Sequence, residues 1–128
     1  MIYTHCEHTC PTIVATMQAI QKALPEQWRD KVGFVLVSLT PDSDTPAVLA
    51  DFAKQRNLNP DHWTLLTGDA SDVRSLAMVL GVKYNMAANN EVSHSNLLSV
   101  VDAQGRLLFQ EKGLASSAKA LAERITQD

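Results

Sequence analysis

The sequence has few of the residues that mark specialised classes of protein: five glycines, five prolines, two cysteines and 5% aromatic residues in 128. No apolar run approaches the ~20 residues that a membrane-spanning helix needs. Like charges form no block, and the formal net charge of −3 argues against a surface for nucleic acid or anionic membranes. Two cysteines are too few to staple a small secreted domain. An ordinary globular composition remains, with 45% hydrophobic residues, and we expect one domain over residues 1–128.

Hydrophobic periodicity predicts helices and strands that alternate along the chain. A helix is expected over residues 11–24, where apolar residues recur at helical spacing. The β-branched run Val32–Leu39 predicts a parallel strand that is covered on both faces. Thr45 and Pro46 carry the signature of a helix start, and this helix should fray near Asn57.

The middle of the chain continues the same alternation. Residues Trp63–Leu66 predict a short strand, and Asp69 or Ser71 is expected to cap a helix that Gly81 ends. The segment Tyr84–Ser93 is polar and loop-like, with a small hairpin that the pattern does not place. A polar loop therefore precedes the last third of the chain.

The last third predicts a β-hairpin and a helix. Residues 96–101 and 106–109 flank the turn Asp102–Gly105, and an amphipathic helix should begin at Ser116 or Ser117. The whole order is strand, helix, strand, helix, strand, helix, hairpin, helix. This order predicts a thioredoxin-like three-layer α/β/α sandwich.

The expected first strand is short. It has only the residues Met1–Thr4, about 13 Å at ~3.3 Å per residue. We therefore expect a truncated first strand, left stunted or completed by another molecule, in a chain that lacks native N-terminal residues.

The two cysteines, Cys6 and Cys10, stand between the expected first strand and first helix, in the sequence HCEHTCP. Thiols at a helix N-terminus feel the positive end of the helix dipole, which favours the thiolate. Residues four apart share one helix face, so both sulfurs can point at a single site. Two soft thiolates suit Cu(I), or Zn(II) with further ligands, and they also allow a disulfide. The alternative is that both are small buried residues without a chemical task.

A third ligand would have to come from one of four histidines. His5 and His8 adjoin the cysteines so closely that either ring has little freedom to turn into the same site. His62 lies in an Asn-Pro-Asp loop and is expected to be solvated or to cap a helix. In a thioredoxin-like fold, the loop that carries His94 lies against the N-terminus of the first helix, so His94 can approach both sulfurs. The alternative for His94 is a solvent-exposed loop histidine.

Three segments resemble a known family: the CxxxCP motif at Cys6–Pro11, residues Ser38–Pro46, and Ser93-His94-Ser95 before a strand. They are similar to the Sco/SenC/PrrC copper-binding proteins, which assist assembly of the dinuclear copper centre of cytochrome c oxidase. The resemblance implies a thioredoxin-like domain that binds one copper ion, Cu(I) or Cu(II), through Cys6, Cys10 and His94. It also implies a copper-accepting partner, such as the copper-bearing subunit of the oxidase, and a parent chain anchored at the extracytoplasmic face of a membrane.

The chain departs from the family pattern at three positions. The family's DPxRDTP reads TPDSDTP here, so Thr40 and Ser43 replace an acid and an arginine. Asp44 is retained; it is expected near the metal or, in preference, as part of a helix cap. Ser93 replaces an aspartate before the histidine, where a metal-bound imidazole normally finds an acceptor that orients it.

The expected function is copper capture and delivery. The alternative is a thiol–disulfide oxidoreductase that reduces a partner's cysteines, with Cys6 and Cys10 as its redox-active pair, or a redox sensor. Thioredoxin-type enzymes have two residues between their cysteines and a cis-proline opposite them. Here three residues intervene, and no proline lies near His94, which favours the copper chaperone.

Overall fold

The computed structural model describes residues 1–2, 9–82, 84–86, 92–94, 97–112 and 118–127. The chain divides into two compact units, residues 1–10 with 33–95 and residues 11–32 with 96–128. The expectation of a single domain stays a prediction. Among the described helices, none has the length and apolar character needed to cross a membrane.

The first unit is built on two parallel strands, β1 (Phe34–Val37) and β2 (Trp63–Leu66), as the sequence predicted. The rings of Phe34 and Trp63 stack with their centroids 4.8 Å apart. Exposure alternates along β1, since Leu36 is 2% exposed and Val35 is 52% exposed. The expectation that both faces of this strand are covered is therefore wrong at Val35, because a β-branched residue also suits the exposed face of a pleated strand.

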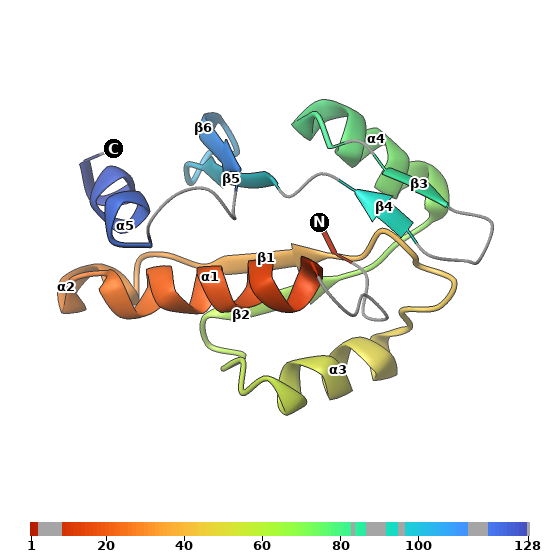
Figure 1. The fold of residues 1–128 in the computed structure, drawn as a ribbon, viewed down its shortest axis with the longest axis horizontal. Helices are drawn as coiled ribbons and strands as arrows, with labels where there is room; N and C mark the ends of the chain where they lie inside the picture. Colours follow the sequence, from red (N-terminus) through yellow and green to blue (C-terminus); the bar gives the residue numbers. More distant parts are fainter. Residues whose placement is uncertain (3–8, 83, 87–91, 95–96, 113–117, 128) are drawn as a thin grey trace. The chain divides into compact units, whose positions relative to one another are not determined.

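Two helices of the first unit begin and end at the predicted signals. Helix α3 (Pro46–Gln55) connects β1 to β2 and packs against β2 (Figure 1). Its N-cap is Thr45, whose Oγ1 accepts a hydrogen bond from the backbone N–H of Val48 at 3.3 Å. Helix α4 (Ala70–Leu80) follows Asp69 and ends at Gly81, whose φ of 72° is a left-handed conformation that suits glycine.

Ile2 lies on the edge of β1 opposite to β2. It forms a parallel bridge with Ser38: the Ile2 N–H donates to the Val37 carbonyl at 2.9 Å, and the Leu39 N–H donates to the Ile2 carbonyl at 2.6 Å. Ile2 is 1% exposed. This bridge is what the described residues show of the expected first strand, whose residues 3 and 4 lie outside them.

A small antiparallel hairpin follows α4. Strand β3 (Tyr84–Met86) pairs with β4 (Val92–His94) in the register Tyr84↔His94. The segment that the sequence indicated as loop-like therefore contains two short strands. Three-residue strands carry too little alternation to be placed from sequence alone.

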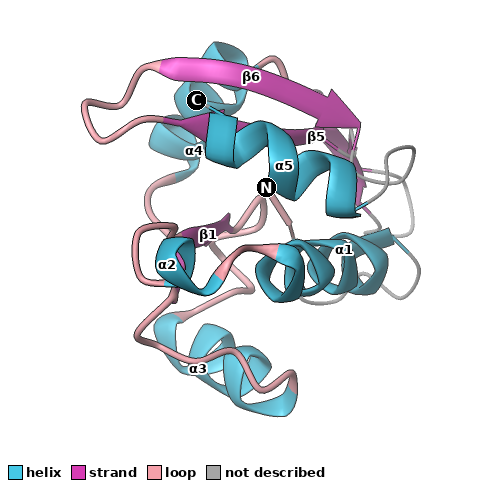
Figure 2. Ribbon diagram, turned by 90° about the vertical axis from the view of Figure 1, so that its left-hand side faces the viewer, coloured by secondary structure: helices cyan, strands magenta, loops and turns pink. Residues whose placement is uncertain are grey.

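The second unit holds a β-hairpin, as predicted. Strand β5 (Leu97–Val101) pairs antiparallel with β6 (Leu107–Lys112) (Figure 2). Helix α5 (Ala118–Gln127) follows; the predicted start at residue 116 or 117 lies outside the described residues. Arg124 of α5 pairs with Glu111 of β6 at 2.5 Å and lies 4.0 Å from the ring centroid of Phe109, so charge and ring contacts join helix and hairpin.

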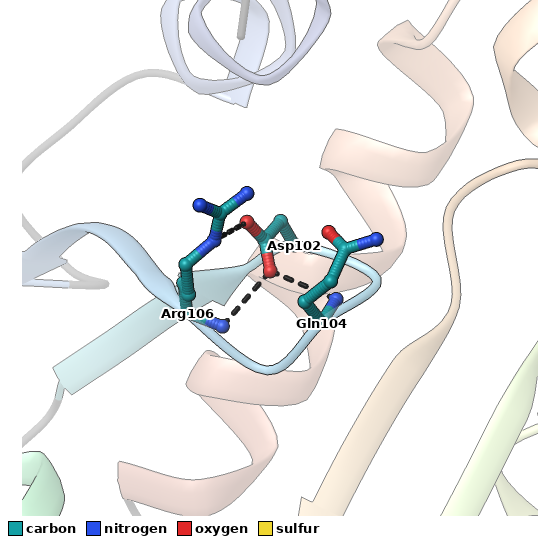
Figure 3. A network of polar contacts seen from close by, with 3 residues as sticks. All are labelled: Asp102, Gln104 and Arg106. Atoms are coloured by element: carbon teal, nitrogen blue, oxygen red, sulfur yellow. Dashed lines mark hydrogen bonds and ion pairs between the residues drawn. The ribbon is translucent and has the colours of Figure 1, made fainter.

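The turn between β5 and β6 is organised by the side chain of Asp102 (Figure 3). Its Oδ1 accepts hydrogen bonds from the backbone N–H groups of Gln104 and Arg106, both at 2.9 Å, and its Oδ2 accepts one from Nε of Arg106 at 2.8 Å. Gly105 has a φ of 82°, as the turn requires. The backbone hydrogen bond from Arg106 is the main cause that lowers the pKa of Asp102 below its ordinary value.

Two further helices lie before β1 in the described part of the chain. Helix α1 (Thr9–Ala23) has its first two residues in the first unit and the rest in the second. The buried residues Ile13, Val14 and Ile20 match the predicted apolar face. Helix α2 (Glu26–Arg29) was not predicted; it follows Pro25, which presets the backbone before a helix start.

Candidate metal centre

One of the two cysteines, Cys10, lies at the start of α1. Cys10 is the second residue of this helix and Pro11 is the third, so the motif begins a helix as the sequence predicted. Backbone N–H groups in the first turn of an α-helix have no partner within the helix, and they favour an anion such as a thiolate. Cys6 lies outside the described residues.

His94 is the last residue of β4, and its register partner is Tyr84 of β3. The expectation that His94 lies in a loop is wrong, because Val92–His94 form strand β4, which pairs with β3. Pairing with β3 restrains the backbone that carries the imidazole.

Asp44 is fully buried, at 0% exposure, and so is Ser38. Oδ2 of Asp44 accepts hydrogen bonds from two hydroxyl groups, Ser38 Oγ at 2.8 Å and Thr40 Oγ1 at 2.9 Å. A carboxyl group is rarely buried without such partners. Removing one partner of a buried polar group costs about 1–3 kcal/mol, so these contacts matter to the local structure.

The backbone between Ser38 and Asp44 also forms hydrogen bonds within this segment. The N–H of Thr40 donates to Ser38 Oγ at 3.0 Å. The carbonyl of Thr40 accepts from the N–H groups of Ser43 and Asp44, at 3.0 and 2.8 Å. We call Ser38, Thr40 and Asp44 the hydroxyl–carboxyl cluster.

The preference for Asp44 as part of a helix cap is not what the structure shows. The N-cap of α3 is Thr45, the next residue, while Oδ2 of Asp44 accepts from the hydroxyls of the strand end. Asp44 lies six positions after Ser38, and helix-capping rules consider only partners that lie closer in sequence.

Sequence reasoning missed Ser38 and Thr40 as partners of Asp44. A signal was present, since Ser38 is a polar residue within the apolar run Val32–Leu39. A buried serine in a strand needs a hydrogen-bond partner, and that need pointed to a nearby polar residue.

The predicted site residues fall within one compact unit. Residues 1–10 and 33–95 form this unit, so it includes Cys10, Asp44 and His94. In the part of the chain that the structure describes, no three His, Cys, Asp or Glu residues cluster in a way that could hold a metal ion. Because Cys6 lies outside that part, the ligand set of Cys6, Cys10 and His94 stays a prediction.

A curated relative is similar to most of this chain. The SCO1 protein homolog of Bacillus subtilis (strain 168) is 29% identical over 119 residues, which cover 91% of this chain and 61% of the relative. The chain thus spans less than two thirds of the length of this relative.

Solved structures share the fold. Arabidopsis thaliana ScoI with copper bound has a TM-score of 0.85 at 21% identity, over 98% of this chain and 77% of that one. BsSco, a Sco-family cytochrome c oxidase assembly protein in which a disulfide switch was identified, has a TM-score of 0.78 at 24% identity, over 98% of this chain and 75% of that one. These likenesses confirm the thioredoxin-like α/β fold.

The sequence pattern of a family extends over the same length. The SCO1/SenC family model matches residues 1–127, a range that includes both cysteines, the TPDSDTP segment and His94. Fold and sequence pattern agree along nearly the whole chain, and this protein therefore belongs to the SCO1/SenC family.

Proposed function

We propose that this protein captures one copper ion with Cys6, Cys10 and His94 and passes it to a copper protein, the copper-bearing subunit of cytochrome c oxidase. The observation that carries the proposal is the SCO1/SenC match over residues 1–127. It is supported by the copper-bound ScoI of the same fold and by the assignment of BsSco to cytochrome c oxidase assembly.

The chemistry of the donors suits Cu(I) as cargo. Two thiolates supply soft ligands and one imidazole completes a three-coordinate set. Cys10 lies in the first turn of α1, where the helix dipole favours its thiolate. Binding displaces protons from both thiols, so the affinity for Cu(I) should fall as the pH drops.

An anaerobic titration of Cu(I) against a competing chelator tests the proposal. We expect one Cu(I) per wild-type chain and loss of tight binding in Cys6→Ala and Cys10→Ala. His94→Ala should bind at least about tenfold more weakly, equivalent to about 1.4 kcal/mol. The matched control is His62→Ala, because His62 lies in the loop before β2 and is no predicted ligand; its affinity should equal the wild type.

Two results of that titration would contradict the proposal. One is a Cys6→Ala variant with unchanged Cu(I) affinity, and the other is an equal loss in His62→Ala and His94→Ala. The same variants titrated with Cu(II) add a second comparison. His94→Ala should weaken Cu(II) binding more than Cu(I) binding, since imidazole is a harder donor than thiolate.

A second candidate is a thiol–disulfide oxidoreductase, favoured by the disulfide switch of BsSco. One thiolate attacks a partner disulfide, and the other cysteine displaces the partner from the mixed disulfide. The partner leaves with two thiols, and Cys6 and Cys10 remain as a disulfide. Catalytic reduction of insulin disulfides by the metal-free protein, with a chemical reductant to recycle it, would favour this candidate. No turnover, together with tight Cu(I) binding, favours the chaperone.

We also propose that this protein is located at the extracytoplasmic face of a membrane, such as that of the bacterial periplasm. The support is the resemblance to the anchored Sco/SenC/PrrC proteins. Protease treatment of spheroplasts from cells that express the protein tests this location: protection from added protease would contradict an extracytoplasmic domain.

A further inference from the structure

The hydroxyl–carboxyl cluster has no part in the proposed ligand set, yet it contains the buried polar residues Ser38 and Asp44, both at 0% exposure. Its three members lie where β1 ends. One oxygen, Oδ2 of Asp44, accepts from the hydroxyls of Ser38 and Thr40. The cluster therefore ties the end of a strand to the residue immediately before the N-cap of α3.

Ile2, near the N-terminus, forms its β-bridge with the same end of β1. Ser38 is the bridge partner of Ile2, and the residues on either side of Ser38 make both backbone hydrogen bonds to Ile2. The N–H of Ser38 itself points the other way, to the carbonyl of Leu66 in β2 at 2.9 Å. Ser38 thus lies between the N-terminal segment and β2, with its side chain bonded to Asp44.

The bridge restricts where the cysteine segment can go. Cys6 is four residues after Ile2, so their Cα atoms are at most about 14 Å apart at 3.3–3.6 Å per residue. Because the bridge is parallel, Ile2 runs in the same direction as β1, whose end carries the hydroxyl–carboxyl cluster.

We propose that Ser38, Thr40 and Asp44 are positioning residues that hold the strand end against Ile2 and so keep Cys6 within reach of Cys10. The expected effect on Cu(I) binding deepens the proposed function and rests on it. The expected effect on the disulfide between Cys6 and Cys10 requires only the two cysteines. Loss of the cluster should lower the effective concentration of one thiol at the other, which weakens both the disulfide and a shared metal site.

The variants come in matched sets. Thr40→Val removes a hydroxyl that donates to Asp44, and Thr40→Ser restores it. Asp44→Asn alters the acceptor. Thr67→Val removes a buried hydroxyl of the same unit that makes no hydrogen bond among the described residues, and Leu49→Ala opens a cavity under α3, where Leu49 is 4% exposed. The last variant lowers stability and removes no hydrogen-bonding group of the cluster.

The first readout is the equilibrium of each folded, metal-free protein with glutathione. Two thiols of the protein lose two electrons and two protons to glutathione disulfide, which yields two glutathione thiols. Thr40→Val and Asp44→Asn should shift this equilibrium toward the reduced protein by at least about tenfold, about 30 mV for a two-electron couple. Thr40→Ser, Thr67→Val and Leu49→Ala should stay within about twofold of the wild type.

The second readout is Cu(I) affinity by chelator competition. Thr40→Val and Asp44→Asn should lose about 10–100-fold, the range found when groups that support metal ligands are removed. If the wild type binds no Cu(I) tightly, the proposed function fails, while the glutathione equilibrium still decides the positioning role. Should Asp44→Asn fail to fold, the pair Thr40→Val and Thr40→Ser decides it. Wild-type equilibria in Thr40→Val, or an equal shift in Leu49→Ala, would overturn the proposal.

Discussion

Asp44 and Thr45 are neighbours in sequence whose side chains have different tasks. Oγ1 of Thr45 accepts a hydrogen bond from the N–H of Val48 and so caps the N-terminus of α3. The side chain of Asp44 accepts from hydroxyls at the end of β1. Sequence rules rank both residue types as good N-caps, so only the loop geometry separates the two roles.

Substitution of Thr45 should therefore destabilise the protein more than substitution of Asp69, the residue at the start of α4. Thr45→Ala removes the capping hydrogen bond and should lower the free energy of unfolding by about 1 kcal/mol. Asp69→Ala should cost less, because the side chain of Asp69 makes no capping hydrogen bond. Urea unfolding of both variants measures the difference; a larger loss in Asp69→Ala would contradict the assignment of these caps.

Among the elements, the β5–β6 hairpin shows how a short turn is encoded locally. Asp102 accepts hydrogen bonds from residues two and four positions ahead, and Gly105 takes the positive φ. All of these partners lie within five residues, so the sequence was sufficient to predict the turn. The β3–β4 hairpin has strands of three residues each, and no comparable turn signal was recognised there.

The β5–β6 hairpin should lose stability at low pH, where the carboxylate of Asp102 becomes protonated. Since the folded pKa of Asp102 is lowered, chiefly by the backbone N–H of Arg106, its contribution is complete above the ordinary carboxyl pKa. It is lost as the pH falls through the lowered value. Amide hydrogen exchange in β5 and β6, compared between the wild type and Asp102→Asn, measures this. Asp102→Asn should show a weaker acid dependence, and identical pH profiles would contradict the role of the carboxylate.

Across the whole chain, the elements with local signals were predictable from the sequence, whereas the convergence of Cys6, Cys10 and His94 stays a prediction. Pro46 and Gly81 mark helix ends through their own backbone preferences. The partnership of Ser38 with Asp44 depends on how a loop closes after β1. His94 is separated from Cys10 by more than eighty residues, so its predicted approach to the cysteines depends on the fold. That approach was inferred from the place of its segment in a thioredoxin-like fold, and its role as a ligand from the family resemblance.

The proposed function requires that Cys6, Cys10 and His94 bind one metal ion together. X-ray absorption spectroscopy at the copper edge of the anaerobic Cu(I)-loaded protein tests this requirement, because it identifies the donor atoms on the metal. We predict two sulfur donors and one nitrogen donor per copper in the wild type, and loss of the nitrogen donor in His94→Ala. A wild-type spectrum without two sulfur donors, or a nitrogen donor that persists in His94→Ala, would contradict the account.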